Sequence, residues 1–338
     1  MNKLFLILSS LLFISYNIKN IEEIIIKSNK KYFLIAVILI IAAAVILFNM
    51  KNKPTFDSNK SFQNLLDQVA FGPRNPGSTG HSRAKDYLIK TLKRYADRVI
   101  EQNFVYHDKR DSLIKYNGTN IIASFNLEPE DPGRIMLTAH WDTRPFADEE
   151  KDSSKWSTPI PGANDGASGV AVLLEIARIL KENSTNTGID IILFDLEDIG
   201  DNEKTYSSGN GNPYCIGSEY FVNNLGNYRP KYGILLDMVG DKNLSIVKEA
   251  NSYYSAPDII KLIWDAADKI NSPVFIDKTG EGIMDDHVHF LKRGIKVVDL
   301  IQQPFPDYWH TLEDTPDKCS HESLKQVGEV LVELLYSE

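Results

Sequence analysis

The chain has 338 residues, 43% of them hydrophobic, so it can bury a sizeable core without a disulfide framework or structural metals. Its net charge is −9, although residues 1–56 carry seven Lys and only two Glu, so the negative charge belongs to the rest of the chain. An acidic globular part argues against nucleic acid as a partner. Cys215 and Cys319 lack metal-binding spacing, and both a single bridge and two free thiols remain open.

The N-terminal part of the sequence predicts a membrane anchor. The run 32–48 is uncharged and almost wholly apolar, at the short end of what spans a bilayer. More Lys precede it than closely follow it, which places the N-terminus in the cytoplasm and the globular part on the periplasmic, extracytoplasmic side of the cell membrane. A second apolar run near the N-terminus leaves a hairpin topology open. The expected divisions are a cytoplasmic or signal-like segment (1–31), a single transmembrane anchor (32–50), a linker (51–59) and a globular domain (60–338).

Beyond the linker, helix-like and strand-like segments alternate along the chain. Apolar residues that recur every three or four positions predict helices over 61–70, 80–95, 166–180, 218–224, 256–270 and 322–336. Short apolar runs predict strands over 99–106, 120–125, 134–140, 189–196, 232–236, 244–247, 274–276 and 297–301. This alternation predicts an α/β fold, a three-layer α/β/α sandwich around a central mixed, mostly parallel sheet.

Three of the predicted strands end in side chains that can bind a metal. One strand ends at His140, and two others directly precede Glu197–Asp198 and Asp237. Ligand sites of open α/β sheets gather at the carboxyl ends of the strands, so we expect these groups to lie near one another. Imidazole and carboxylate groups suit zinc, and a catalytic zinc site needs no thiolate. Because Glu197 and Asp198 are adjacent, their side chains should point differently, one toward a metal and one free to act as a base.

Two further groups of carboxylates lie outside the strands. Asp165 belongs to the glycine-rich segment 162–169, whose small residues indicate close approach by another group. A helix N-cap is the alternative reading of Asp165. Asp285 and Asp286 are adjacent, and neighbouring carboxylates raise the pKa of one of the pair, which suits proton handling. An acidic first turn of a helix is the alternative for this pair.

An aromatic, proline-rich loop presents the last candidate, His310, directly after Trp309. A plain surface loop does not account for a tryptophan beside an exposed histidine, whereas a tryptophan next to a ligand makes an apolar pocket wall. His81, His107, His289 and His321 carry no comparable context.

Together the motifs resemble the zinc aminopeptidase-like family, and more closely its glutaminyl cyclase branch. The resemblance rests, in chain order, on Ala139-His-Trp-Asp-Thr-Arg144, Gly162-Ala-Asn-Asp-Gly-Ala-Ser-Gly169, Phe194-Asp-Leu-Glu-Asp198, Asp285-Asp-His287 and Phe305-Pro-Asp-Tyr-Trp-His310. It implies one zinc per chain, and these further roles: Asp165, Asp198 and His310 as zinc ligands, Glu197 as general base and acid, Asp237 and Asp286 as a proton-handling network, and Trp309 as a wall of the substrate pocket. His140 would bind metal only if a second zinc were present. The family usually has Glu-Glu where this chain has Glu197-Asp198, one methylene shorter.

The resemblance implies that the substrates are peptides or proteins with an N-terminal glutamine, which the enzyme would convert to pyroglutamate with release of ammonia. A two-zinc aminopeptidase is the first alternative, because all five potential ligands are present: His140, Asp165, Asp198, Asp237 and His310. The second alternative is an inactive, membrane-anchored binding module. Such a chain should have lost its base or a ligand, yet Glu197 and His310 are both present.

Overall fold

The computed structural model describes residues 37–40, 53–109, 113–127, 133–200 and 214–337. The folded part is a compact unit, Pro54–Glu338. Most of the predicted anchor over 32–50 lies outside the described residues. Within the described ranges, no helix has the length and apolar character needed to cross a bilayer. The anchor and its topology therefore stay predictions.

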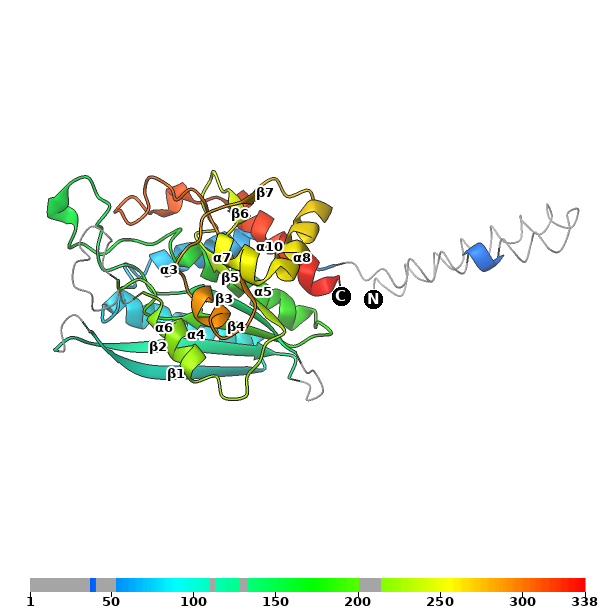
Figure 1. Cartoon of the computed structure of the whole chain (residues 1–338), viewed down its shortest axis with the longest axis horizontal. Helices are drawn as coiled ribbons and strands as arrows, with labels where there is room; N and C mark the ends of the chain where they lie inside the picture. Colours follow the sequence, from blue (N-terminus) through cyan, green and yellow to red (C-terminus); the bar gives the residue numbers. More distant parts are fainter. Residues whose placement is uncertain (1–36, 41–52, 110–112, 128–132, 201–213, 338) are drawn as a thin grey trace, which may run out of the picture. The chain divides into compact units, whose positions relative to one another are not determined.

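A six-stranded sheet in the order β1-β2-β4-β3-β5-β8 forms the centre of the fold (Figure 1). Its strands are β1 (Arg98–His107), β2 (Lys115–Phe125), β3 (Ile135–His140), β4 (Ile189–Phe194), β5 (Tyr232–Asp237) and β8 (Val297–Ile301). The pairs β1–β2 and β2–β4 are antiparallel, whereas β4–β3, β3–β5 and β5–β8 are parallel. A small second sheet pairs β6 (Ile246–Lys248) with β7 (Phe275–Thr279). The expected mixed, mostly parallel sheet is confirmed.

Helices cover both faces of this sheet (Figure 1). One layer holds α3 (Ser58–Val69), α4 (Thr79–Tyr95), α5 (Ala167–Glu182), α8 (Pro257–Lys269) and α10 (His321–Tyr336). The other holds α6 (Ile216–Asn223) and α9 (His287–Leu291), with α7 (Ala250–Ser255) beside β8 and α9. Two single turns, η1 (Ser153–Lys155) and η2 (Pro316–Lys318), lie in loops. The sequence did not predict α7 and α9, because helices of five or six residues are too short to display a period.

Successive side chains of the central strands alternate between two cores. Leu137 and Leu193 belong to the large core shared with α3, α5 and α10. Their neighbours Met136 and Phe194 pack on the opposite face, where Phe194 contacts Phe290 of α9. Strands buried on both faces read as continuous apolar runs, which is why the sequence located them. The same burial holds their carboxyl ends, with His140 and Asp237, in fixed positions.

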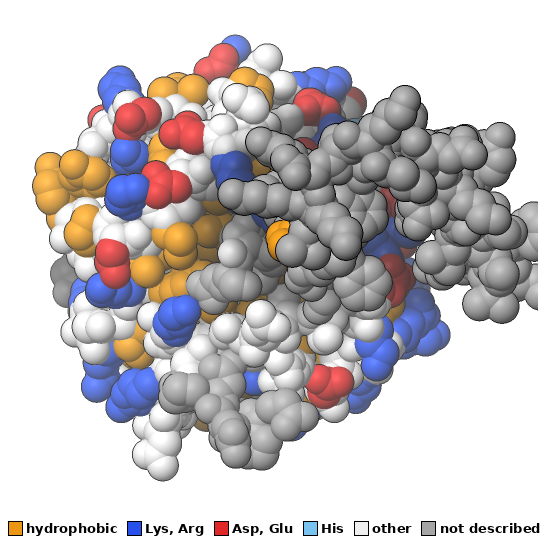
Figure 2. Space-filling model, turned by 90° about the vertical axis from the view of Figure 1, so that its right-hand side faces the viewer, with side chains coloured by type: hydrophobic (Ala, Val, Ile, Leu, Met, Phe, Trp, Pro, Cys, Tyr) orange, Lys and Arg blue, Asp and Glu red, His pale blue; other side chains and the backbone are white. Residues whose placement is uncertain are grey.

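The visible surface of the folded unit is mixed in character. On the face shown in Figure 2, basic and acidic side chains are interspersed, with hydrophobic side chains between them. The negative net charge is therefore not gathered into a single acidic surface on this face. Both cysteines lie inside the fold as free, buried thiols, which decides between the two states left open by the sequence.

Candidate active site

The carboxyl edge of the parallel strands brings together the groups predicted from the sequence. His140 ends β3, Asp237 ends β5, and Asp198 follows β4. Asp165 arrives from the turn before α5, and His310 from the loop after β8. Side-chain donor atoms of Asp165, Asp198 and His310 all lie within 4.8 Å of one another, and all three residues are buried. Residues that are far apart in the sequence thus form one site.

This ligand triad has room for a cation. His310 Nε2 lies 3.4 Å from Asp165 Oδ2 and 3.4 Å from Asp198 Oδ2. Asp198 is 1% exposed, yet its Oδ2 accepts no hydrogen bond from the described residues. A buried carboxylate oxygen without a partner is costly unless a cation or a proton reaches it. Two carboxylates and one imidazole also form a suitable protein ligand set for zinc, so these residues fit the metal that the resemblance implies.

A second triad shares one residue with the first. His140 Nε2 lies 3.1 Å from Asp165 Oδ1 and 3.3 Å from Asp237 Oδ1, so Asp165 stands between the two triads. Burial alone would lower the pKa of His140, but hydrogen bonds to Asp142, Asp165 and Asp237 outweigh it and raise the pKa well above its usual range. Burial alone would also lower the pKa of His310, but the carboxylates of Asp198 and Asp165 raise it to about 9. Protonation therefore does not distinguish the two histidines as metal ligands.

Asp142 fixes the loop that carries the carboxylate pair. Its two oxygens accept hydrogen bonds from the backbone N–H groups of Glu197, at 3.1 Å, and Asp198, at 3.3 Å. One of these oxygens also lies 3.6 Å from His140 Nδ1. A single buried carboxylate thus connects the end of β3 to the loop after β4.

Glu197 points away from the ligand triad, as expected for the neighbour of Asp198. Its Oε1 accepts a hydrogen bond from Cys215 Sγ at 3.2 Å, and its Oε2 lies 4.0 Å from His140 Nδ1. Burial, with the charges of Asp198 and the Asp285–Asp286 pair, raises the pKa of Glu197 well above its usual range, against the opposing effect of His140. A carboxyl group with a raised pKa takes up a proton more readily than an ordinary glutamate, which suits a group that accepts and returns a proton.

The predicted proton-handling residues lie in the same electrostatic environment. Burial raises the pKa of Asp237 to about 7. Burial and the neighbouring Asp285 raise the pKa of Asp286 well above its usual range. Asp286 occupies the N-cap position of α9 but makes no capping hydrogen bond there, so helix capping does not explain this carboxylate.

The aromatic loop holds His310 differently from our expectation. His310 is only 4% exposed, so the prediction of an exposed histidine is wrong. The ring of Trp309 covers it in a stacked contact, with centroids 3.6 Å apart and planes 23° from parallel. On its other side the imidazole faces the carboxylates of Asp165 and Asp198. Trp309 itself is half-buried, and its role as a wall of a substrate pocket stays a prediction.

Four residues around the site have a left-handed backbone although none is glycine. They are Leu196, Cys215, Met238 and His310, with φ values of 57°, 59°, 47° and 53°. Leu196 directly precedes Glu197, and Met238 directly follows Asp237. Side chains other than glycine, asparagine and aspartate rarely adopt this conformation, and such residues concentrate at functional sites.

Gly166 lets the turn before α5 approach His140 closely, as the small residues of 162–169 predicted. At Gly166, with φ 85°, an added Cβ would lie 2.7 Å from the carbonyl oxygen of Asp142 and 2.9 Å from the ring of His140. Only a residue without a side chain lets this turn lie against His140. Gly166 also takes the N-cap position of α5, so the N-cap reading of Asp165 is wrong and its carboxylate is free for the site.

Sequence reasoning missed the buried polar groups that hold the site loops. Arg74 donates hydrogen bonds to the carbonyl oxygens of Trp141 and Gly162, and Asp314 accepts from the backbone N–H groups of Asn164 and Asp165. Further missed groups are the guanidinium of Arg144 with Asp148, and a buried cluster of Glu249, His287 and Asp299. These are single polar residues, most of them in loops or at the ends of helices, and a single residue produces no period, so no sequence pattern identified them.

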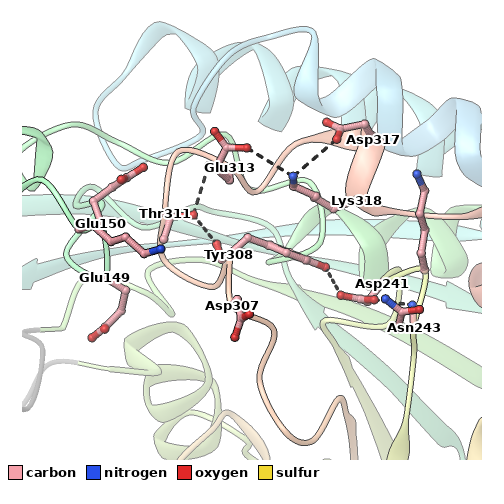
Figure 3. A pocket seen from close by; sticks show the side chains of 12 residues that line it. Glu149, Glu150, Asp241, Asn243, Asp307, Tyr308, Thr311, Glu313, Asp317 and Lys318 are labelled. Carbon is pink, nitrogen blue, oxygen red and sulfur yellow. Dashed lines mark hydrogen bonds and ion pairs between the residues drawn. The ribbon is translucent and has the colours of Figure 1, made fainter.

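A cavity of about 640 Å³ lies beside the His310 loop (Figure 3). Its wall includes Asp241, Tyr308 and Thr311, and the Tyr308 hydroxyl donates to Asp241. Lys318 lies among acidic residues, 3.3 Å from Glu313 Oε2. None of the predicted metal or catalytic residues lines this cavity, so the ligand triad is a separate feature.

Comparison with known proteins agrees with this arrangement. Residues 120–335 match Peptidase family M28. The structure of a glutaminyl cyclase bound to N-acetylhistamine, from Bacteroides thetaiotaomicron, is 40% identical, with a TM-score of 0.81, over 85% of this chain and all of that one. A Zn-dependent exopeptidase from Parabacteroides distasonis is 38% identical, with a TM-score of 0.80, over 85% of this chain and all of that one.

A curated relative comes from the peptidase side of the family. Aminopeptidase YwaD of Bacillus subtilis is 28% identical over 216 residues, which make up 61% of this chain but 41% of that relative. The chain therefore spans less than half the length of this relative. The similarity to both cyclases and peptidases, together with the shared fold and the expected order of motifs, shows that the chain belongs to peptidase family M28 and resembles its glutaminyl cyclases.

Proposed function

We propose that this protein is a glutaminyl cyclase, which converts the N-terminal glutamine of peptides and proteins to pyroglutamate and releases ammonia. The observation that carries the proposal is the ligand triad of Asp165, Asp198 and His310 beside a free carboxyl group. The three buried residues offer donor atoms within 4.8 Å of one another, and the adjacent Glu197 points to Cys215 instead, so it can act as a base. Similarity to a solved glutaminyl cyclase supports a cyclase reaction at this site.

Asp165, Asp198 and His310 would hold the zinc. When bound there, zinc supplies Lewis-acid polarisation of a carbonyl oxygen. The residues of the chain account for the proton transfers. Glu197 accepts a proton from the α-amine of the substrate, whose nitrogen forms a bond to the γ-carbonyl carbon of the same glutamine. The bond from this carbon to the amide nitrogen breaks, and Glu197 returns the proton to the departing ammonia.

The attacking amine belongs to the substrate, so the enzyme needs no activated water. Tethering gives a high effective molarity, and one metal is then sufficient. Asp237 and Asp286 would share protons with Glu197, and Trp309 would bound the substrate pocket. The raised pKa values of the three carboxyl groups support this network.

Product analysis tests the reaction directly. The full chain is incubated with a Gln-Xaa dipeptide amide, and the products are read by mass spectrometry. Loss of ammonia with the peptide bond intact is the expected result. Release of free glutamine would instead identify an aminopeptidase.

The metal is tested separately from the reaction. His310→Ala should remove bound zinc, because one of three ligands is lost, and metal content by atomic absorption measures this. Unchanged zinc content would mean that the ligand set is wrong.

A two-zinc aminopeptidase remains the second candidate, and a specific observation favours it. Donor atoms of His140, Asp165 and Asp237 also lie within 4.8 Å of one another, and Asp165 could bridge two ions. Metal stoichiometry separates the candidates: two tightly bound zinc ions per chain would contradict the cyclase. A membrane-anchored binding module without catalysis would bind zinc but produce neither product.

We also propose that the anchor over 32–50 holds the enzyme at the cell membrane with its catalytic part on the periplasmic side. The apolar run and the distribution of lysines support this topology. Protease accessibility of the folded unit in intact spheroplasts tests it, and complete protection would contradict it.

A further inference from the structure

We propose that Arg144, together with Asp148, positions two of the metal ligands, Asp198 and His310, as one unit. This inference rests on the proposed metal site but not on the reaction. It concerns residues that the resemblance does not assign.

Arg144 is fully buried, and its guanidinium contacts two carboxylates. Nη1 donates to Asp198 Oδ1 at 2.8 Å, while Nε and Nη2 donate to Asp148 at 2.7 Å and 2.6 Å in a two-pronged contact. Asp148 Oδ1 in turn lies 3.8 Å from His310 Nδ1. One planar group therefore connects two ligands that come from separate loops.

The geometry leaves one oxygen of Asp198 available. Arg144 occupies Oδ1, whereas Oδ2 has no hydrogen-bond partner among the described residues and lies 3.4 Å from His310 Nε2. A carboxylate held in this way presents a single oxygen in a fixed direction. Hydrogen bonds from groups behind the direct ligands orient the metal ligands in many zinc sites.

His310 is fixed from the same side. Its Nε2 faces the ligand carboxylates, and its Nδ1 faces Asp148. The carboxylate of Asp148 on one side and the ligand carboxylates on the other hold the ring in the orientation that presents Nε2 to the proposed metal position.

The charges also favour a ligand-positioning role over a purely structural one. Arg144 and His310 both lie against the carboxylates of Asp148 and Asp198, so the arginine belongs to the same charged cluster as the candidate ligands. The short side chain of Asp198 fits this arrangement. The family usually has glutamate at this position, and Arg144 holds the aspartate where it meets His310.

The test measures zinc affinity of the full-length protein by competition with a chromophoric chelator. Arg144→Met should weaken zinc binding roughly 10- to 100-fold, the usual effect of losing an outer partner of a metal ligand. Arg144→Lys should recover only part of this loss, because an ammonium group cannot contact both carboxylates in the same plane. The visible spectrum of the cobalt-substituted protein should change in both variants, since the ligand geometry changes.

Arg134→Met is the matched control. This arginine pairs with Asp190 near the opposite ends of the same strands, at 2.7 Å. Its loss should lower the melting temperature but leave zinc affinity and the cobalt spectrum unchanged.

Asp148→Asn keeps the inference testable if Arg144→Met fails to fold. It preserves side-chain size and the contact between Arg144 and Asp198, and it should still weaken zinc binding several-fold. Zinc affinity within twofold of the wild type in folded Arg144→Met, or in Asp148→Asn when Arg144→Met does not fold, overturns the inference. Because the readout is zinc binding, a protein that turned out to be a peptidase would leave this result interpretable.

Discussion

Two Arg–Asp pairs join the segments of β3 and β4, one at each end of the strands. The Arg134–Asp190 pair is partly buried and the Arg144–Asp198 pair is buried, and the two pairs differ in the hydrogen bonds that they make. At the amino end, Arg134 donates to Asp190 and to the carbonyl oxygens of Asn126, Phe125 and Ile189. At the carboxyl end, Arg144 leaves one oxygen of Asp198 without a hydrogen bond.

The difference in hydrogen bonding indicates that one end of the strands serves stability and the other end serves function. The Arg134–Asp190 pair serves stability, because each guanidinium nitrogen of Arg134 donates to a carboxylate or carbonyl oxygen. The Arg144–Asp198 pair leaves a buried carboxylate oxygen without a hydrogen bond, which lowers the stability of the fold. Such a cost is typical of positions that receive a ligand or a proton. The open oxygen of Asp198 lies among the donor atoms of two further candidate ligands, Asp165 and His310, and this supports a functional role for the carboxyl edge.

Glu197→Gln should give the largest effect at the carboxyl edge. Loss of the proton acceptor should reduce kcat by roughly 1,000-fold, within the usual range for general acid–base groups, while bound zinc stays at the wild-type level. Glu175→Gln replaces another buried glutamate, 1% exposed, in α5 away from the site, and it should leave kcat unchanged. Retained turnover in Glu197→Gln would show that this role is misassigned.

Substitution of Asp190 or Asp198 by asparagine should affect stability at the amino edge and zinc binding at the carboxyl edge. Asp190→Asn should cost roughly 2 kcal/mol of unfolding free energy, because it breaks a partly buried, charge-assisted hydrogen bond with Arg134. Asp198→Asn should instead reduce zinc affinity by roughly 100-fold. Thermal melting and chelator competition on both variants measure the two effects, and equal loss of zinc binding in both would remove the distinction.

The pH profile gives a third, smaller contrast. Glu197 must be deprotonated to accept a proton, and its raised pKa places the acidic limb of kcat/KM above the usual range of glutamate. Asp286→Asn removes a negative charge that raises this pKa, so the pKa should fall and the limb should move to lower pH. Asp190→Asn should leave the limb in place. A shift to higher pH in Asp286→Asn would contradict the proposed network.

Cys215→Ala should give the smallest effect. It removes the thiol that donates to Glu197 Oε1, a bond worth roughly 1 kcal/mol, and should lower kcat about fivefold with KM unchanged. Cys215→Ser keeps a donor and should restore most of the rate. Cys319→Ala, at the other buried cysteine, is the control and should not affect turnover. Equal rates in the alanine variants would argue against positioning of Glu197 by this thiol.

The apolar strands made most of the fold and the core of the site predictable. His140, Asp237 and the Glu197–Asp198 pair follow from strands buried on both faces, whose ends are visible in the sequence. Arg144 was not predictable in the same way. Its role depends on the folding of a long loop that brings it to Asp198, 54 residues further along the chain. The burial of His310 was missed for the same reason, because the stacking of Trp309 is a property of loop conformation.

The left-handed backbone at Leu196, Met238 and His310 has a consequence for the stability of this protein. Each such residue costs about 1 kcal/mol or more relative to glycine, so the chain gives up stability where its candidate chemistry lies. Glycine would not recover this free energy, because Leu196, Met238 and His310 are buried and removing a buried side chain costs more than the backbone strain. The strain at the site is therefore retained by the packing of the same side chains, and no single change to glycine relieves it at a net gain in stability.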